Sequence, residues 1–176
     1  GYIVQGIKCK VPLGYNAATG QMPATWTGSW EPAKVFTTDP SWILYDLLTG
    51  PARYSLGLAE SEVDKFSFGE ASRRNGDQVD DHQGGLQNRY TFNGSFTRQD
   101  DALKILTAVA SSMDAQIWVG GGIVYLTQDR PASTARLFSN ANVLDGNFEY
   151  VGTASSGRPN TARVSWRNPG DRFEAK

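Results

Sequence analysis

The sequence predicts an α+β fold in which two or three helices combine with mixed, small antiparallel sheets. Apolar residues recur at the three- and four-residue spacing of a buried helix face in the windows 40–49, 60–75 and 102–113. Short alternating runs, bounded by glycine, asparagine or proline, surround these windows and are typical of strands and hairpins. We expect an α+β domain over residues 1–130 and a β-rich extension over residues 131–176.

The first 38 residues predict a strand followed by a loop or an open hairpin. Residues 3–10 alternate in the period-two pattern of a strand, and turn residues recur between residues 12 and 20. Cys9 is the single cysteine, which excludes an internal disulfide and a thiolate-rich metal site. Its place in the alternating run predicts a small buried hydrophobe.

Two tryptophans, Trp26 and Trp30, flank a Thr-Gly-Ser turn. The pair could stack on a sugar ring, or it could hold the turn by packing on a neighbouring strand. We favour packing, because buried aromatic side chains contribute large apolar areas to protein cores.

The strongest helix signal follows Asp39, whose carboxylate can cap the free amide groups of a first turn that begins with Pro40. A Gly-Pro pair directly after residue 49 predicts the end of this helix. A second helix is expected over residues 60–75, where a Phe-Gly pair weakens the middle and could mark a kink.

Three carboxylates at the start of the second expected helix, Glu60, Glu62 and Asp64, invite comparison with the paired acids of glycoside hydrolases. Carboxylates in a first helical turn also stabilise the positive end of the helix dipole. Because nothing in the sequence places an opposing acid across a cleft, we interpret them as solvent-facing helix residues.

The segment 75–87 gathers oxygen and nitrogen ligands in a glycine-bearing run that includes Asp77, Asp80, Asp81 and His82. It lacks the ligand order of a helix-loop-helix calcium site. His82 is the only histidine, which excludes a multi-histidine metal site within this chain. We interpret the run as a solvated connection, and cation binding stays open as the alternative.

Residues 89–129 predict a strand, a helix and a hairpin in that order. The run 89–97 alternates aromatic and polar residues, and the acids at 100 and 101 favour the positive end of the following helix. The three glycines at 120–122 can take the positive φ that closes a tight hairpin. A strand rather than a helix follows them, so they do not predict a phosphate-binding loop.

Other patterns exclude further function classes. The sequence has no Gly-X-Ser-X-Gly elbow, so we expect no nucleophilic catalysis. It also has no phosphate-cradling glycine loop that ends in Lys and Ser or Thr, and we expect no cofactor. A formal net charge of -1 offers no field for a polyanion, so we expect no stable nucleic-acid binding. No apolar run reaches the roughly 18 residues that span a bilayer. The chain begins with glycine and enters a strand at once, which predicts a segment of a longer protein.

After residue 130 the sequence predicts β structure. Asparagine and aspartate cluster over residues 140–147 in a pattern suited to turns. Two further strands are expected at 148–150 and 162–166, and the exposed loop between them carries Arg158 at its tip.

Seven segments follow one another in the chain: GIKCKVPLGYN, TWTGSW, DPSWILYDLLTGPARYSLGL, VDKFSFGEASRRNGD, residues 90–129, LFSNANVLDGNFEY and NTARVSWRNP. In this order and spacing they resemble the tail tip attachment protein J family of lambda-like phages and prophages, also called host specificity protein J. The resemblance covers nearly all of the chain. Members of that family carry a cysteine near the end of the second helix, where this chain has Arg73, Arg74 and Asn75.

The resemblance implies a phage tail hub domain with an architectural role and no enzymatic activity. It implies that the full-length protein forms a homotrimer that closes the tail tube, contacts other tail tip proteins, and supports host attachment and DNA delivery. Contact with the host outer-membrane receptor would lie in parts outside this segment. The implied location is the virion tail tip, with assembly in the bacterial cytoplasm.

Four residues are candidate subunit or ligand contacts, namely Trp26, Trp30, Trp42 and Arg158. Large aromatic residues exposed on an isolated domain are candidates for the repeated interface of a symmetric ring. Two other function classes stay open. One is a carbohydrate-binding module that uses Trp26 and Trp30, and the less favoured one is a cell-wall glycan hydrolase with Glu60 or Glu62 as its acid.

Overall fold

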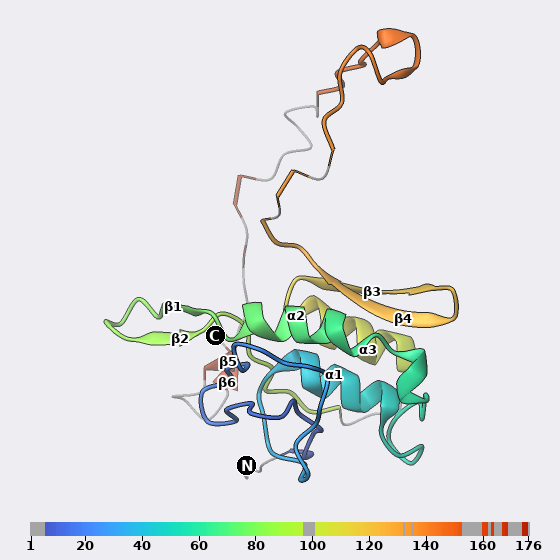
Figure 1. Ribbon diagram of the computed structural model, residues 1–176. Helices are drawn as coiled ribbons and strands as arrows, with labels where there is room; N and C mark the ends of the chain where they lie inside the picture. The colour runs from blue at the N-terminus through green and yellow to red at the C-terminus, as the bar shows by residue number, and fades with distance from the viewer. Residues whose placement is uncertain are drawn as a thin grey trace. The chain divides into compact units, whose positions relative to one another are not determined.

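The computed structural model describes residues 6–96, 101–131, 133–134, 136–152, 160–161, 163, 167–168 and 174–175. The chain divides into two units, one of residues 5–130 and one that holds residues 131–176, and each is described by itself (Figure 1). The two-domain organisation expected from the sequence stays a prediction. Within the described residues, no helix combines the length and the apolar character that a membrane crossing requires.

Helix α1 spans Pro40–Thr49, as the sequence predicts. Asp39 caps it by accepting a hydrogen bond from the Ser41 amide at 2.9 Å, and the proline occupies the first turn. Gly50 follows the last helical residue in extended conformation. The buried apolar side chains of α1 include Trp42, Leu44, Tyr45 and Leu48.

The second helix begins later than the sequence predicts. A 3₁₀ turn, η1, spans Glu60–Glu62, and helix α2 spans Lys65–Asn75. Between them, Val63 has extended backbone and forms a parallel bridge with Val124. The Asp64 amide donates to the Val124 carbonyl oxygen at 2.9 Å, while the Asp64 carboxylate caps α2. The prediction of one continuous helix was therefore wrong over its first turn, because pairing with a distant strand overrides local helix propensity.

Two short strands pair where the sequence predicts a loop. Strands β1, Gln78–Asp80, and β2, Leu86–Asn88, form an antiparallel hairpin. Residues 89–96 form no strand, so the strand expected there was wrong over its described residues. The amides of Tyr90 and Phe92 donate to carbonyl groups in two different segments, at the end of α2 and just before α1. The alternation of aromatic and polar residues is not sufficient for a strand there, because a strand needs a ladder of backbone hydrogen bonds with one neighbouring strand.

The third helix and the hairpin after it confirm the sequence prediction. Helix α3 spans Ala102–Ser111 and is capped by the Asp101 carboxylate. Strands β3, Ala115–Gly120, and β4, Ile123–Gln128, pair antiparallel along their whole length. The two turn residues, Gly121 and Gly122, have φ values of 60° and 82°, as a tight primed hairpin turn requires.

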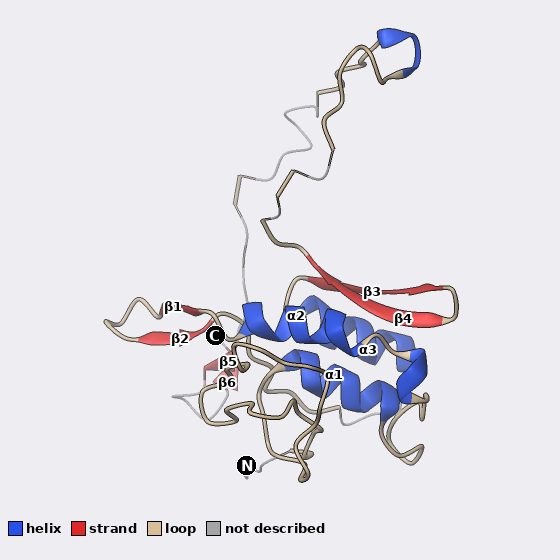
Figure 2. Ribbon diagram, in the orientation of Figure 1, coloured by secondary structure: helices blue, strands red, loops and turns tan. Residues whose placement is uncertain are grey.

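The helices and the β3–β4 hairpin of this unit pack in layers (Figure 2). Helix α1 contacts both α2 and α3, and the hairpin covers these two helices, with β4 on α2 and β3 on α3. The core between the layers holds buried residues from every helix and both strands, among them Leu44, Tyr45, Leu48, Phe68, Ala71, Leu106, Val109, Met113, Val124 and Leu126.

The segment before α1 packs on this core mostly as irregular chain. Isolated antiparallel bridges join Cys9 to Val35 and Pro12 to Trp30. Cys9 is fully buried, as predicted, and burial raises the pKa of its thiol to about 12. The thiol therefore stays protonated and unreactive at neutral pH. Of the strand expected over residues 3–10, the described part keeps only the Cys9 bridge.

In the second unit, η2 spans Leu144–Gly146, and strand β5, Arg167–Asn168, pairs antiparallel with β6, Glu174–Ala175. Residues 148–150 do not form the predicted strand, because alternation without a ladder of backbone hydrogen bonds does not make one. The strand expected at 162–166 lies outside the described residues apart from residue 163, and Arg158 lies outside them as well.

Candidate interaction site

Six aromatic side chains meet where the 26–30 turn, α1 and the start of α2 come together. This aromatic cluster consists of Trp26, Trp30, Trp42, Tyr45, Phe66 and Phe68. The three indoles contact one another edge to face, with ring centroids 5.3 to 5.7 Å apart. Trp42 is fully buried at the centre, and Trp26 and Trp30 are partly buried against the core. The two outer tryptophans therefore pack as the core interpretation predicts.

The 26–30 turn is attached to the first residue of α2. Gly28 has a φ of 92°, which favours glycine, and its carbonyl oxygen accepts a hydrogen bond from Lys65 Nζ at 2.7 Å. On the other side, the bridge between Pro12 and Trp30 holds the turn against the segment before it. The aromatic cluster is thus fixed by contacts from three separate parts of the chain.

Two ammonium groups lie over the Trp30 ring. Lys10 Nζ lies 4.8 Å from the ring centroid and Lys65 Nζ lies 5.8 Å from it, within the range of cation–π attraction. Lys10 also forms an ion pair with Glu60. The Tyr45 ring contacts Trp30 as well, at 5.0 Å between centroids. A sugar platform needs an open ring face, so this geometry disfavours the tryptophan pair as a glycan site.

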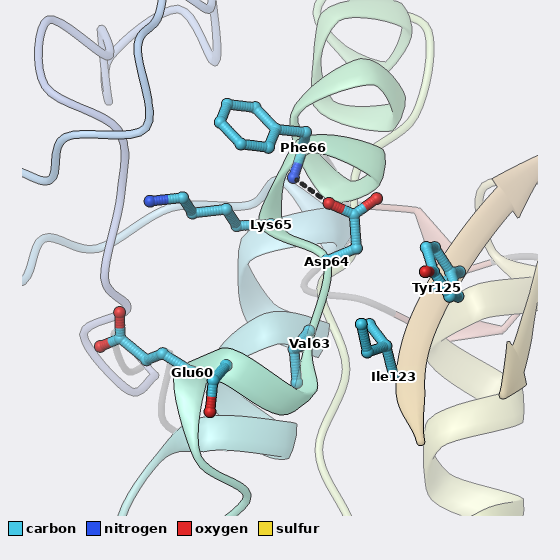
Figure 3. Close-up of a pocket in the computed structure, with 8 residues that line it drawn as sticks. Glu60, Val63, Asp64, Lys65, Phe66, Ile123 and Tyr125 are labelled. Carbon is cyan, nitrogen blue, oxygen red and sulfur yellow. Dashed lines mark hydrogen bonds between the residues drawn. The ribbon is translucent and has the colours of Figure 1, made fainter. Parts of the chain in front are cut away.

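An open pocket of about 370 Å³ lies between the start of α2 and strand β4 (Figure 3). Its lining residues are Glu60, Ser61, Val63, Asp64, Lys65, Phe66, Ile123 and Tyr125. Figure 3 shows Glu60 and Lys65 extending on one side, with Ile123 and Tyr125 on the opposite side. The pocket therefore joins a charged edge to an apolar strand face.

The acids of the hydrolase alternative serve local structure. The Asp64 carboxylate accepts a hydrogen bond from the second residue of α2 at 3.2 Å. Glu62 accepts one from the Ala59 amide at 2.7 Å, and Glu60 pairs with Lys10. A glycosidase needs one acid that can donate a proton and a second carboxylate across the scissile bond. The contacts of these three acids do not favour that arrangement.

Beside the pocket, the outer face of the β3–β4 hairpin exposes large side chains. Trp118 and Tyr125 stack across the strands with ring centroids 4.5 Å apart, and Trp118 Nε1 donates to Thr127 Oγ1 at 2.8 Å. Trp118 is 49% exposed. We name the set Trp118, Ile123 and Tyr125 the hairpin face. Sequence reasoning missed it, although the alternation within β4 places Tyr125 opposite the buried residues of that strand.

The acidic turn between β1 and β2 uses its carboxylates on its own backbone. Asp81 accepts hydrogen bonds from the Gln83 and Gly85 amides, both at 2.8 Å, and Asp80 accepts one from the His82 amide at 2.7 Å. The Gln83 and Gly85 amides lower the pKa of the Asp81 carboxyl. Among the residues that the structure describes, no group of three acidic, histidine or cysteine side chains could hold a metal ion. Cation binding by this turn and Asp77 gains no support from this geometry.

Comparison with known proteins places the chain in a family. No protein-family model matches it. Tip attachment protein J of Escherichia phage SECphi27 is 30% identical over 147 residues, which is 82% of this chain. Tip attachment protein J of Escherichia phage SECphi4 is 25% identical over 176 residues, which is 96% of this chain. This chain belongs to the tip attachment protein J family. It spans only 12% and 15% of the length of these two J proteins.

The structure changes the set of contact candidates in this J-family segment. Trp42 is fully buried, so its indole offers no surface to a partner or a sugar. Trp26 and Trp30 keep part of their surface, and their role as contacts stays a prediction. Arg158 lies outside the described residues.

The end of α2 carries polar side chains with structural partners in this member of the J family. Arg73 donates to the Pro23 carbonyl oxygen at 2.8 Å. Asn75 is fully buried and hydrogen-bonded to side chains of three other elements or segments. With these residues in place of a thiol, no redox role is expected at this position.

Proposed function

We propose that this chain is a structural segment of a phage tail tip protein and that it carries no enzymatic activity. The observation that carries the proposal is similarity over 82% and 96% of the chain to two proteins named tip attachment protein J. In this proposal the segment contributes to the hub that closes the tail tube. The full-length protein is located at the virion tail tip and supports host attachment and DNA delivery.

The proposed assembly is a homotrimer of the full-length protein in contact with other tail tip proteins, formed in the bacterial cytoplasm. A three-fold ring repeats one heterologous interface, in which a patch on each subunit meets a different patch on the next. The hairpin face supports this role, because large half-exposed aromatic side chains are typical of protein–protein contacts. Trp26 contacts Phe66 and Trp30 lies under Lys65, both at the start of α2, and the two tryptophans are further contact candidates.

This proposal gives the segment no direct contact with the host receptor and no stable binding of nucleic acid. The host outer-membrane receptor binds parts of the protein outside this segment. DNA that passes through the tail tube is not bound stably by this segment, since a net charge of -1 gives no overall positive field to attract a polyanion. We expect binding no tighter than about 10⁻⁴ M at physiological salt.

The test is mass spectrometry of density-purified phage particles from the source, with a search for peptides of residues 105–130. The proposal expects these peptides in the purified particles, at a few copies per particle. Peptides found in the cell lysate and absent from the purified particles would contradict it. A quantified internal standard from a known tail tube protein provides the copy-number control.

A further inference from the structure

Two asparagine–glycine pairs occur in the sequence, Asn75-Gly76 and Asn93-Gly94. In such a pair the backbone nitrogen of the glycine can attack the carbonyl carbon of the asparagine side chain, because glycine has no β-carbon to hinder the approach. Whether the reaction takes place in the folded chain depends on how the fold holds the two reacting groups. The structure places the two pairs in opposite environments.

The Asn75-Gly76 pair is fixed at the end of α2. Asn75 is 1% exposed, its Nδ2 donates to the Asp39 carboxylate at 2.8 Å, and its Oδ1 accepts a hydrogen bond from Gln128 Nε2 at 3.1 Å. The Gly76 amide donates to the Ser72 carbonyl oxygen at 3.1 Å. The side-chain amide and the attacking nitrogen are therefore both engaged in hydrogen bonds, and a reaction at this pair requires local opening of the fold.

The Asn93-Gly94 pair lies directly after a residue that is anchored on the core. The Phe92 amide donates to the Thr38 carbonyl oxygen at 2.8 Å, and the Phe92 side chain packs against the core. Asn93 and Gly94 follow in irregular backbone, and both are exposed. Within the described residues, neither the Asn93 side chain nor the Gly94 amide forms a hydrogen bond. These two groups can therefore react without any opening of the core.

Packing explains why glycine stands at residue 94. The rings of Phe92 and Phe96 stack with centroids 6.1 Å apart, and a β-carbon at residue 94 would fall 2.7 Å from Phe92 Cζ. Any other residue would displace the Phe92 ring. The same lack of a side chain leaves the Gly94 nitrogen unhindered.

We propose that Asn93 is a site of spontaneous covalent modification in the folded chain. The Gly94 nitrogen forms a bond to the Asn93 side-chain carbonyl carbon, the bond from that carbon to the side-chain amine breaks, and the proton lost by the Gly94 nitrogen leaves with the amine as ammonia. Water then opens the succinimide ring at either carbonyl carbon, which gives aspartate or isoaspartate. No oxidant, reductant or enzyme is required. The inference does not depend on the proposed tail tip function.

The reaction changes the charge of the chain. Both products carry a carboxylate where Asn93 has a neutral amide, so one negative charge is added and the formal net charge changes from -1 to -2. The isoaspartate product also routes the backbone through the former side chain. Modified chains can therefore be separated by charge and located by mass spectrometry.

The first test incubates the folded wild-type 176-residue chain in mildly alkaline buffer and follows the tryptic peptides of residues 75–89 and 90–98 by tandem mass spectrometry. The proposal expects Asn93 to be modified roughly tenfold or more faster than Asn75, because the reaction at Asn75 waits for local opening. An Asn93 rate at or below that of Asn75 would overturn it. This measurement uses no variant, and a sample digested before the incubation gives the background.

The same incubation in concentrated urea is the control for the role of the fold. In the unfolded chain both pairs lose their different surroundings, so the two rates are expected to converge. Convergence would show that the folded structure protects Asn75 and leaves Asn93 reactive. A ratio of rates that stays the same in urea would contradict the structural explanation.

The second test compares wild type, Asn93→Gln and Asn147→Gln by anion-exchange chromatography after the incubation in mildly alkaline buffer. Both substituted residues are exposed, so the two variants are expected to fold. Glutamine would have to close a larger ring, so Asn93→Gln is expected to lose most of the acidic species that wild type accumulates. Asn147, which a phenylalanine follows, is the matched control, and Asn147→Gln is expected to behave as wild type. Equal acidic fractions in Asn93→Gln and wild type would overturn the proposal.

Discussion

The Trp26 indole lies directly against the backbone of Gly69, so that a β-carbon at residue 69 would fall 2.9 Å from Trp26 Cζ3. Gly69 is buried in the middle of α2, which runs through it without a break. The sequence suggests that glycine weakens the helix at this position. The structure explains why glycine stands here, because only a residue without a side chain lets the Trp26 ring approach α2 this closely.

We expect Gly69→Ala to lower the free energy of unfolding by about 1–3 kcal/mol, although alanine is the better helix former, because the added methyl overpacks the contact with Trp26. Chemical denaturation of the purified chain measures the change. The control is the same substitution in a Trp26→Ala background, where the space is open and alanine is expected to be neutral or stabilising. An equal loss in both backgrounds would show that the indole is not the cause.

The hairpin face gives a prediction for assembly. Trp118→Lys is expected to cost the isolated chain about 1 kcal/mol or less, because the indole is half exposed. In phage that carry the substitution in the full-length protein, we expect a clear loss of infectious particles, since a charge would be buried at the proposed subunit contact. Plaque titre and electron microscopy of tails provide the readout.

The matched control for that prediction is Leu13→Lys, which places the same charge at a side chain that is 52% exposed and does not belong to the hairpin face. This control is expected to leave the titre close to wild type. Equal titres for the two variants would contradict a subunit contact at the hairpin face, whereas a loss confined to Trp118→Lys would support it.

The packing of Trp26 and Trp30 also predicts the outcome of a glycan titration. Because the Trp30 ring is covered by two lysines and a tyrosine, we expect no saturable change in tryptophan fluorescence with cell-wall or lipopolysaccharide glycans up to about 1 mM. A turbidity assay on peptidoglycan is likewise expected to show no clearing. Saturable quenching that disappears in Trp26→Ala would restore the carbohydrate-binding alternative.

Local signals in the sequence were sufficient to predict α1, α3 and the β3–β4 hairpin. Asp39 and Asp101 cap the two helices from adjacent positions, and the hairpin turn is closed by Gly121 and Gly122 at positive φ. Each of these signals acts within a few residues, so it can be recognised without knowledge of the fold. Membership of the J family was also visible in the order of the sequence segments.

Long-range contacts decided the parts of the fold that the sequence did not predict. Val63 leaves the helical conformation because Val124 offers it a strand edge some sixty residues later in the chain. The run around Tyr90 alternates like a strand but finds no neighbouring strand with which to form a ladder. The sequence predicts Asp39 as a helix cap, yet its burial beside Ser72 and Asn75 depends on how α1 and α2 pack. Such environments arise from residues far apart in sequence, and for that reason the hairpin face and the buried carboxyl became recognisable only in the folded chain.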